Sequence, residues 1–237
     1  MLLALGTWLV YVADRILDGL RHAGAGRLRA RHLFYVRHRN VFLVAGSTGT
    51  ALILWLVITH MRPVTRREDL MFFVFALAYF VLIHTFGKRA EHWFPKEMAV
   101  GVLFATATAV PAWSRIDHHT QLIPYIALFA LLCWLNCVAI EKWESTWERT
   151  LSTSISHGST VWAQEHLKEL AVCTALTAGL LFVSSEGVCR LIPAAATLSA
   201  IVFWLLDRHH GELNPIHLRI AADAALLTPL LFVLVIP

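Results

Sequence analysis

Seven long apolar runs alternate with polar connectors along this sequence. The runs cover residues 41–59, 70–86, 98–113, 122–140, 170–185, 191–206 and 220–236. An α-helix rises about 1.5 Å per residue, so about 20 apolar residues cross the hydrocarbon core of a bilayer, which is about 30 Å thick. The runs therefore predict an all-α, polytopic transmembrane bundle of about eight helices, in which residues 1–237 form a single helical domain.

The eighth helix is predicted from a shorter apolar run, residues 2–13, which is followed directly by Asp14 and Arg15. This run is too short to cross a bilayer unaided. Two explanations stay open: the natural chain begins earlier and the run ends a longer helix, or the helix is short and covered by a neighbour. The start lacks the basic region and the small-residue cleavage site of a signal peptide.

The composition narrows the classes of function. Hydrophobic residues make up 57% of the chain and charged residues 15%, whereas charged residues form about 25% of an average soluble domain. These values exclude a soluble nucleic-acid-binding protein, a disordered tail and a disulfide-stapled secreted module. We therefore expect membrane lipids, and no nucleic acid, among the partners of this chain.

The basic residues predict the orientation in the membrane. Of the 20 lysines and arginines, 15 lie in the connectors 14–40, 86–98, 141–169 and 207–219, which alternate with the less basic ones. Basic connectors stay on the cytoplasmic side of a membrane. Since the same connectors carry most of the polar residues of interest, we expect a bacterial inner-membrane protein with its active face in the cytoplasm.

A pair of carboxylates, Asp14 and Asp18, follows the first apolar run. If the helix continues past residue 13, the two residues are at positions i and i+4 and lie on one face. Adjacent carboxylates repel each other, and a cation between them removes that repulsion. Mg²⁺ prefers a few carboxylates together with phosphate oxygens, so the pair suits Mg²⁺ bound to a diphosphate. The alternative is a solvated helix end neutralised by Arg15.

Lys88 and Arg89 form a basic pair just before a predicted helix entry at Phe94 and Pro95. Proline is favoured in the first turn of a helix, which places the basic pair at the membrane edge. There, the two cations could bind a phosphate or extend to lipid head groups.

Polar residues also interrupt two of the later apolar runs. Asn136 lies inside a predicted span, where an amide needs a partner, and Glu141 and Glu144 share a face at the end of that helix. Asp223 lies one turn inside the last predicted span, with Arg219 four residues before it as the expected ion-pair partner. The alternatives are a polar cavity at Asp223 and an ordinary acidic helix end at the two glutamates.

These pieces, taken in order, resemble the UbiA family of intramembrane prenyltransferases. The stretch 10–19 (VYVADRILDG) is similar to the family's first aspartate-rich motif, N-D-x-x-D-x-x-x-D, with Val10 and Tyr11 in its first two positions. Lys88-Arg89, followed by Pro95 and then by glycine and phenylalanine at 101–104, resembles the family segment K-R-x-T-x-x-P-Q-x-x-L-G-x-x-F. Asn136 falls where the second aspartate-rich motif begins. The family has nine helices, and the predicted helices of this chain would correspond to helices two to nine, with the first missing or unsequenced.

The resemblance implies Mg²⁺-dependent transfer of an isoprenyl group from its diphosphate to a lipophilic acceptor. Asp14 and Asp18 would hold the metal, and Lys88 and Arg89 would act in catalysis by stabilising the departing diphosphate. The other candidate residues, which we assign to substrate binding, are Tyr11, Arg15, Asn136, Glu141, Glu144 and Asp223.

Three other functions stay open. A terpene-cyclase-like relative would use the same site without an acceptor. A catalytically degenerate relative would bind lipid or act as a subunit of a larger membrane assembly, and the altered aspartate motifs favour it. A transporter or channel component would use Asp223 and the loop histidines, which requires a polar path across the bundle.

Overall fold

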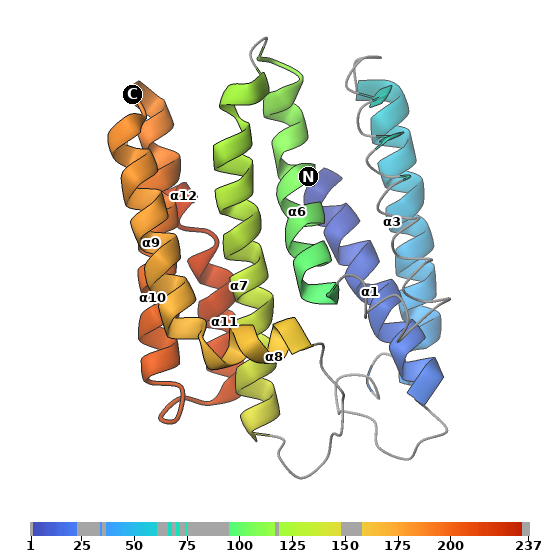
Figure 1. Ribbon diagram of the computed structural model, residues 1–237. Coiled ribbons are helices and arrows are strands. Elements are labelled where there is room, and N and C mark those ends of the chain that lie inside the picture. The colour runs from blue at the N-terminus through green and yellow to red at the C-terminus, as the bar shows by residue number, and fades with distance from the viewer. Residues whose placement is uncertain are drawn as a thin grey trace. The chain divides into compact units, whose positions relative to one another are not determined.

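The computed structural model describes residues 2–22, 34, 37–60, 66–67, 70–71, 74, 95–116, 119–147 and 158–233. Every regular element in this part of the chain is an α-helix or a short 3₁₀-helix, which confirms the all-α prediction (Figure 1). The chain divides into two compact units, residues 1–70 and 71–237, and each is described by itself. Whether the whole chain folds as a single domain stays a prediction.

The first unit pairs α1 (Leu2–His22) with α3 (Arg39–His60). Gly49 of α3 lies at this contact, where a Cβ would be 3.4 Å from methyl groups of Leu5 and Leu9, an ordinary van der Waals distance. Helix α1 is longer than its apolar run and continues through positions 14 and 18. Helix α3 matches the span predicted from residues 41–59, and most of its surface is exposed within its unit.

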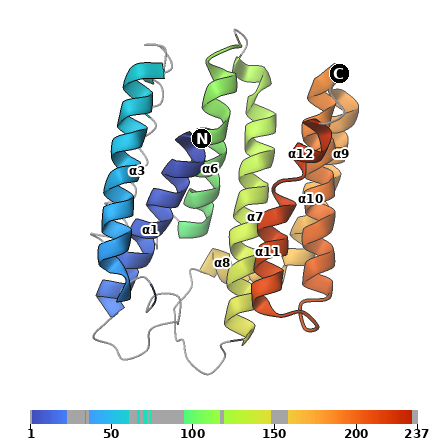
Figure 2. The same ribbon diagram turned by 180° about the vertical axis from the view of Figure 1, so that it is seen from behind.

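The second unit is built around one long helix. Its elements are α6 (Lys96–Trp113), η2 (His119–Gln121), α7 (Ile123–Trp147), α8 (Gly158–Glu165), α9 (Leu167–Ser184), η3 (Gly187–Arg190), α10 (Leu191–Arg208), α11 (Pro215–Ala225) and α12 (Pro229–Val233). Helix α7 contacts α6 on one side and α9, α10 and α11 on the other (Figures 1 and 2). The core between these helices contains the fully buried side chains of Leu135, Val138 and Phe203.

Four of the described helical segments are long and apolar enough to cross a membrane. They are Arg39–His60, His119–Thr146, Leu167–Ser184 and Gly187–Arg208. These segments support the prediction of a membrane protein, whereas the span predicted at residues 70–86 lies outside the described residues. The described part contains nine α-helices rather than about eight in the whole chain, because α8 precedes α9 and because the last predicted span is divided.

The prediction of one continuous span over residues 220–236 is wrong, because the helix breaks between Ala225 and Pro229. A proline has no N–H group, so Pro229 cannot donate the helical hydrogen bond to the carbonyl of Ala225. The hydroxyl of Ser199 on α10 donates to that carbonyl instead, over 2.7 Å. The hydroxyl of Thr228 donates to the carbonyl of Ala195 over 3.0 Å. A side chain of α10 therefore satisfies the Ala225 carbonyl at the break, and the hydroxyl of Thr228 in turn connects the break to the backbone of α10.

Replacing Ser199 by alanine tests this account of the break. We expect Ser199→Ala to lower the free energy of unfolding by about 1–3 kcal/mol, because the buried carbonyl of Ala225 loses its donor. The matched control is Ser47→Ala on α3, where the exposed hydroxyl bonds only a carbonyl of its own helix. Thermal unfolding of both variants in detergent measures the difference, and equal losses would contradict the assigned role of Ser199.

Candidate functional site

The predicted magnesium ligands lie on a helix that fits their proposed role. Helix α1 is continuous from Leu2 to His22, so Asp14 and Asp18 are one helical turn apart. Residues at this spacing have Cβ atoms about 5–6 Å apart on one face, which fits two carboxylates that share one cation. The side chains of Asp14, Arg15 and Asp18 lie outside the described residues, whereas Tyr11 is half-buried.

The predicted basic pair, Lys88 and Arg89, also lies outside the described residues, so its position near Asp14 and Asp18 stays a prediction. Within the part of the chain that the structure describes, no group of three His, Cys, Asp or Glu side chains is placed to hold a metal ion.

The remaining predicted residues come together where α11 packs against α7. The amide Nδ2 of Asn136 donates to Oδ1 of Asp223 over 3.0 Å. Farther toward the C-terminal end of α7, Nη1 of Arg219 lies 3.5 Å from Oε1 of Glu144. Glu141 lies between Asn136 and Glu144 along α7 and is half-buried. The structure thus places a polar stripe along the contact between these two helices.

The expected ion pair between Arg219 and Asp223 within α11 is wrong. The packing of α11 against α7 gives each residue a partner on the neighbouring helix, Glu144 for Arg219 and Asn136 for Asp223. A contact between helices replaces the contact along one helix, because both side chains extend from the face of α11 that meets α7. Asp223 is thus the polar partner that Asn136 was expected to require inside its span.

Asn136 lies four residues before the end of the apolar run 122–140. It precedes the end of the longer helical segment His119–Thr146 by ten residues, a distance of about 15 Å along the helix axis. Only 7% of Asn136 is exposed, and its Oδ1 atom has no hydrogen-bond partner among the described residues. Asp223 is within hydrogen-bond distance of Asn136, so its carboxylate lies at about the same level along α7.

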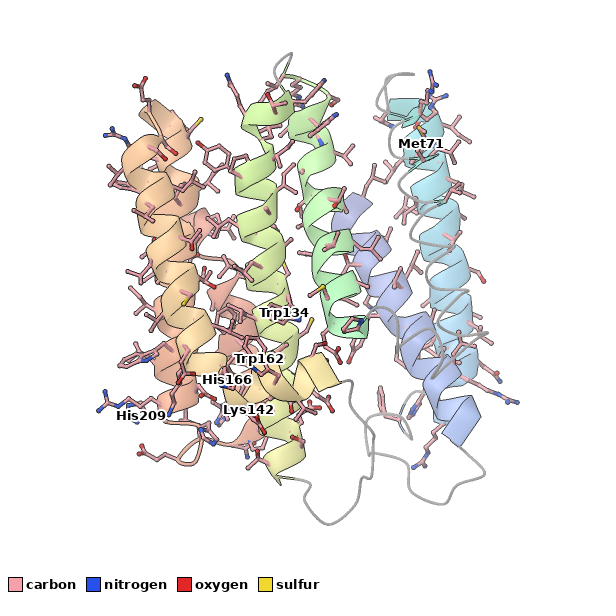
Figure 3. All side chains as sticks on the ribbon, viewed as in Figure 1. Met71, Trp134, Lys142, Trp162, His166 and His209 are labelled. Atoms are coloured by element: carbon pink, nitrogen blue, oxygen red, sulfur yellow. The ribbon has the colours of Figure 1, made fainter. Side chains whose placement is uncertain are left out.

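A buried carboxylate, Asp207, lies near the end of α10 and was not among the residues predicted from the sequence. Its Oδ2 atom lies 3.0 Å from Nζ of Lys142, and its Oδ1 atom accepts a hydrogen bond from Nε1 of Trp143 over 3.0 Å. Asp207 has no exposed surface. Figure 3 shows Lys142 and His209 toward the same end of the second unit, where α10 ends.

One sequence signal could have identified Asp207. The positions 196, 200, 203 and 207 recur at helical spacing and form the buried face of α10. A carboxylate at the end of such an apolar face needs a partner from another helix. The identity of that partner does not follow from the spacing, because Lys142 and Trp143 are about 65 residues away in sequence.

Helix α8 directly precedes α9, and the chain turns a corner between the two helices. A hydrogen bond connects α8 to α6. The hydroxyl of Thr160, which is almost fully buried, donates to Oε2 of Glu97 over 3.0 Å. Trp162 and His166 lie on the outside of this corner with their rings stacked, 5.0 Å between centroids (Figure 3). An exposed tryptophan beside a membrane-spanning helix is typical of the membrane–water interface.

The described site can therefore offer hydrogen-bond acceptors where Asn136 meets Asp223, and internally paired charges near the C-terminal end of α7. Comparison of the chain with family models, with curated proteins and with solved structures finds no match.

Proposed function

We propose that this chain is an integral membrane enzyme that transfers an isoprenyl group from its diphosphate to a lipophilic acceptor, with Mg²⁺ as cofactor. The observation that supports this function is the backbone of α1, which continues as one helix through positions 14 and 18. Two carboxylates one turn apart at a membrane edge suit a metal-bound diphosphate better than a solvated helix end with a single cation, Arg15.

In the proposed site, Asp14 and Asp18 would hold Mg²⁺, which supplies charge neutralisation of the diphosphate when bound. The role that we propose for Lys88 and Arg89 is binding of a diphosphate through charge-assisted hydrogen bonds. The allylic C–O bond breaks with its electron pair passing to the diphosphate oxygen, and the acceptor forms the new bond to carbon and releases a proton. The site faces the cytoplasm of a bacterial cell, as the distribution of basic residues predicts.

The second candidate is a UbiA-like protein without catalytic activity that binds lipid or forms part of a membrane assembly. The pairing along α7 and α11 favours this candidate, because Asn136 bonds Asp223 and Glu144 pairs with Arg219. Residues that satisfy one another in this way stabilise helix packing and leave fewer groups for a second metal ion.

Binding of isoprenyl diphosphates separates the two candidates. We expect the purified chain to bind at least one chain length in the presence of Mg²⁺, and the double variant Asp14→Asn/Asp18→Asn to raise the Kd at least about tenfold, because the metal ligands are lost. Titration of diphosphates of several chain lengths, with and without Mg²⁺, measures this.

The matched control is Glu186→Gln, which removes an exposed carboxylate between α9 and η3 and should leave the Kd unchanged. Circular dichroism shows whether each sample is folded. A folded wild-type protein that binds no isoprenyl diphosphate would reject the transferase and leave the second candidate.

A further inference from the structure

Helix α10 ends in an arginine whose hydrogen-bond donors are unused among the described residues. Arg208 is the last residue of the candidate span Gly187–Arg208, and it is exposed. Its guanidinium carbon lies 5.5 Å from the centre of the Trp204 ring, one turn earlier on the helix. The guanidinium forms no ion pair with any residue that the structure describes. Its N–H groups are therefore available to a ligand.

The ring of Trp204 orients this guanidinium. Trp204 is half-buried and packs against the core of the second unit, which gives the cation a firm support. A cation within about 6 Å of the face of a tryptophan ring is attracted by the electrons of that ring. The N–H groups of a guanidinium point outward in its plane. Stacking on Trp204 therefore holds Arg208 without using the donors that could bind a phosphate.

A second cation, Lys168, lies at the same end of the second unit. Helices α9 and α10 are antiparallel, pack against each other and are joined by the short connection 185–190 (Figure 1). The first turn of α9 therefore meets the last turn of α10. Lys168 is the second residue of α9, is exposed and forms no ion pair with a described residue. The two helices thus bring two cations to one edge of the bundle.

Acidic residues lie next to both cations in the sequence but do not pair with them. Asp207 is buried and is bound to Lys142 instead. Measured around the axis of α9 from the buried Ala171, Lys168 lies about 60° away and Glu169 about 160° away. Lys168 therefore lies beside the packed side of α9, whereas Glu169 extends from its outer side.

Two spans and two tryptophans mark this end as a membrane edge. The candidate span Leu167–Ser184 begins here, and Gly187–Arg208 ends here. Trp162, just before α9, is stacked on His166 in the same spacing of four residues as Trp204 and Arg208. Figure 3 shows His166 toward the same end of the second unit as His209, which follows α10. Tryptophan is favoured at membrane–water interfaces, and arginine extends from helix ends to lipid head groups.

An apolar stripe leads along α10 to the arginine. Leu198, Ile201 and Leu205 are exposed and recur at helical spacing, and Arg208 continues the series three residues later. The stripe is about 15 Å long from its first residue to the arginine. Because it belongs to a helix long and apolar enough to cross a membrane, this side of α10 suits contact with lipid chains.

We propose that Arg208, stacked on Trp204 and assisted by Lys168, binds the phosphate of an anionic phospholipid whose acyl chain lies along the apolar stripe of α10. A guanidinium can bind two phosphate oxygens at once. A lipid with its own ammonium group fits less well, because that cation would be repelled by the two protein cations. The basic connectors predict that the lipid belongs to the cytoplasmic leaflet. This binding does not depend on the proposed function.

The test compares phosphatidylglycerol with phosphatidylcholine of identical acyl chains. Native mass spectrometry of the full chain, released from detergent, measures the Kd of each lipid without Mg²⁺ or diphosphate. We expect phosphatidylglycerol to bind at least about tenfold more tightly, because each cation near an anionic lipid contributes about fivefold. Glycerol 3-phosphate, which has the head group without acyl chains, should bind at least about tenfold more weakly than the whole lipid.

Four variants make the result specific. Arg208→Gln should lower the preference for phosphatidylglycerol about fivefold, and Arg208→Gln/Lys168→Gln should remove most of it. Arg208→Lys, which keeps the charge and loses the planar donor group, should retain part. The matched control is Arg115→Gln, which removes an exposed arginine between α6 and η2 and should keep the full preference.

Circular dichroism shows whether each sample is folded. Equal affinity of folded wild type for the two lipids would overturn the proposal, as would the same loss in Arg115→Gln as in Arg208→Gln. Glycerol 3-phosphate bound as tightly as phosphatidylglycerol would also overturn it, since the apolar stripe would then have no role.

Discussion

Gly101→Ala should lower the free energy of unfolding by about 2–3 kcal/mol, and Gly101→Leu should lower it further, because neither side chain fits between α6 and α7. A Cβ at position 101 would lie 2.8 Å from the backbone N of Trp134 and 2.9 Å from the carbonyl O of Ala130. These neighbours are backbone atoms of α7, so relief requires the two helices to separate rather than one side chain to turn.

The helices meet closely because α6 presents small residues on this face. Ala105, one turn after Gly101 and on the same face, is also buried on α6. Small residues let two helix backbones approach in a membrane, where dispersion contacts between helices replace the hydrophobic effect as the cause of association. Separation of α6 from α7 would therefore lose contacts along the whole interface, which makes this one of the largest effects expected.

The matched control for Gly101→Ala is Gly179→Ala on α9. No atom outside the helix backbone lies within 4 Å of a Cβ at Gly179, so alanine meets open space there. Because alanine favours a helix over glycine by about 1 kcal/mol, this control should be neutral or stabilising. Thermal unfolding in detergent, followed by circular dichroism, measures both. Equal stability of the two variants would mean that α6 and α7 do not approach as described.

Much of the helical fold could be predicted from the sequence, because hydropathy and helix length report directly on a bilayer. The runs at 122–140, 170–185 and 191–206 correspond to α7, α9 and α10 within a few residues at their starts. The end of a helix nevertheless also depends on the polar partners that its last residues find on neighbouring helices. Helix α7 continues past its apolar run to Trp147, since Lys142 and Glu144 find partners on α10 and α11.

The break in the last span shows where hydropathy alone is insufficient. Residues 220–236 are apolar apart from Asp223 and Thr228, so the run indicates one span. Pro229 inside it was a visible signal of a helix boundary. A hydropathy average over the whole run does not reveal the effect of a single proline. The hydroxyl that donates to the Ala225 carbonyl at the break belongs to Ser199, which is on another helix.

The polar contacts of the candidate site could be predicted only in part. The need of Asn136 for a partner followed from its apolar surroundings, but the partner is Asp223, 87 residues later. Local spacing favoured Arg219 for Asp223, because positions i and i+4 are neighbours on any helix. Which faces of two helices meet depends on packing along their whole length, and this information is not contained in the spacing of either helix.

Removing the cation beside the buried Asp207 should destabilise the second unit strongly. We expect Lys142→Met to lower the free energy of unfolding by about 3–5 kcal/mol, because it leaves a carboxylate without exposed surface and without its ionic partner. The double variant Lys142→Met/Asp207→Asn should recover much of this loss, since the uncharged amide oxygen can still accept the hydrogen bond from Trp143.

The control pair lies one turn beyond Asp207. Nδ1 of His209 is 3.5 Å from Oε2 of Glu212, and the side chain of Glu212 is 77% exposed. Because exposed ion pairs contribute about 0–1 kcal/mol, Glu212→Gln should change stability little. A double-mutant cycle on Lys142 and Asp207, measured by thermal unfolding, isolates their coupling. A loss below about 1 kcal/mol in Lys142→Met would mean that water reaches Asp207. In that case Asp207 would not hold the ends of α7 and α10 together in a contact that excludes water.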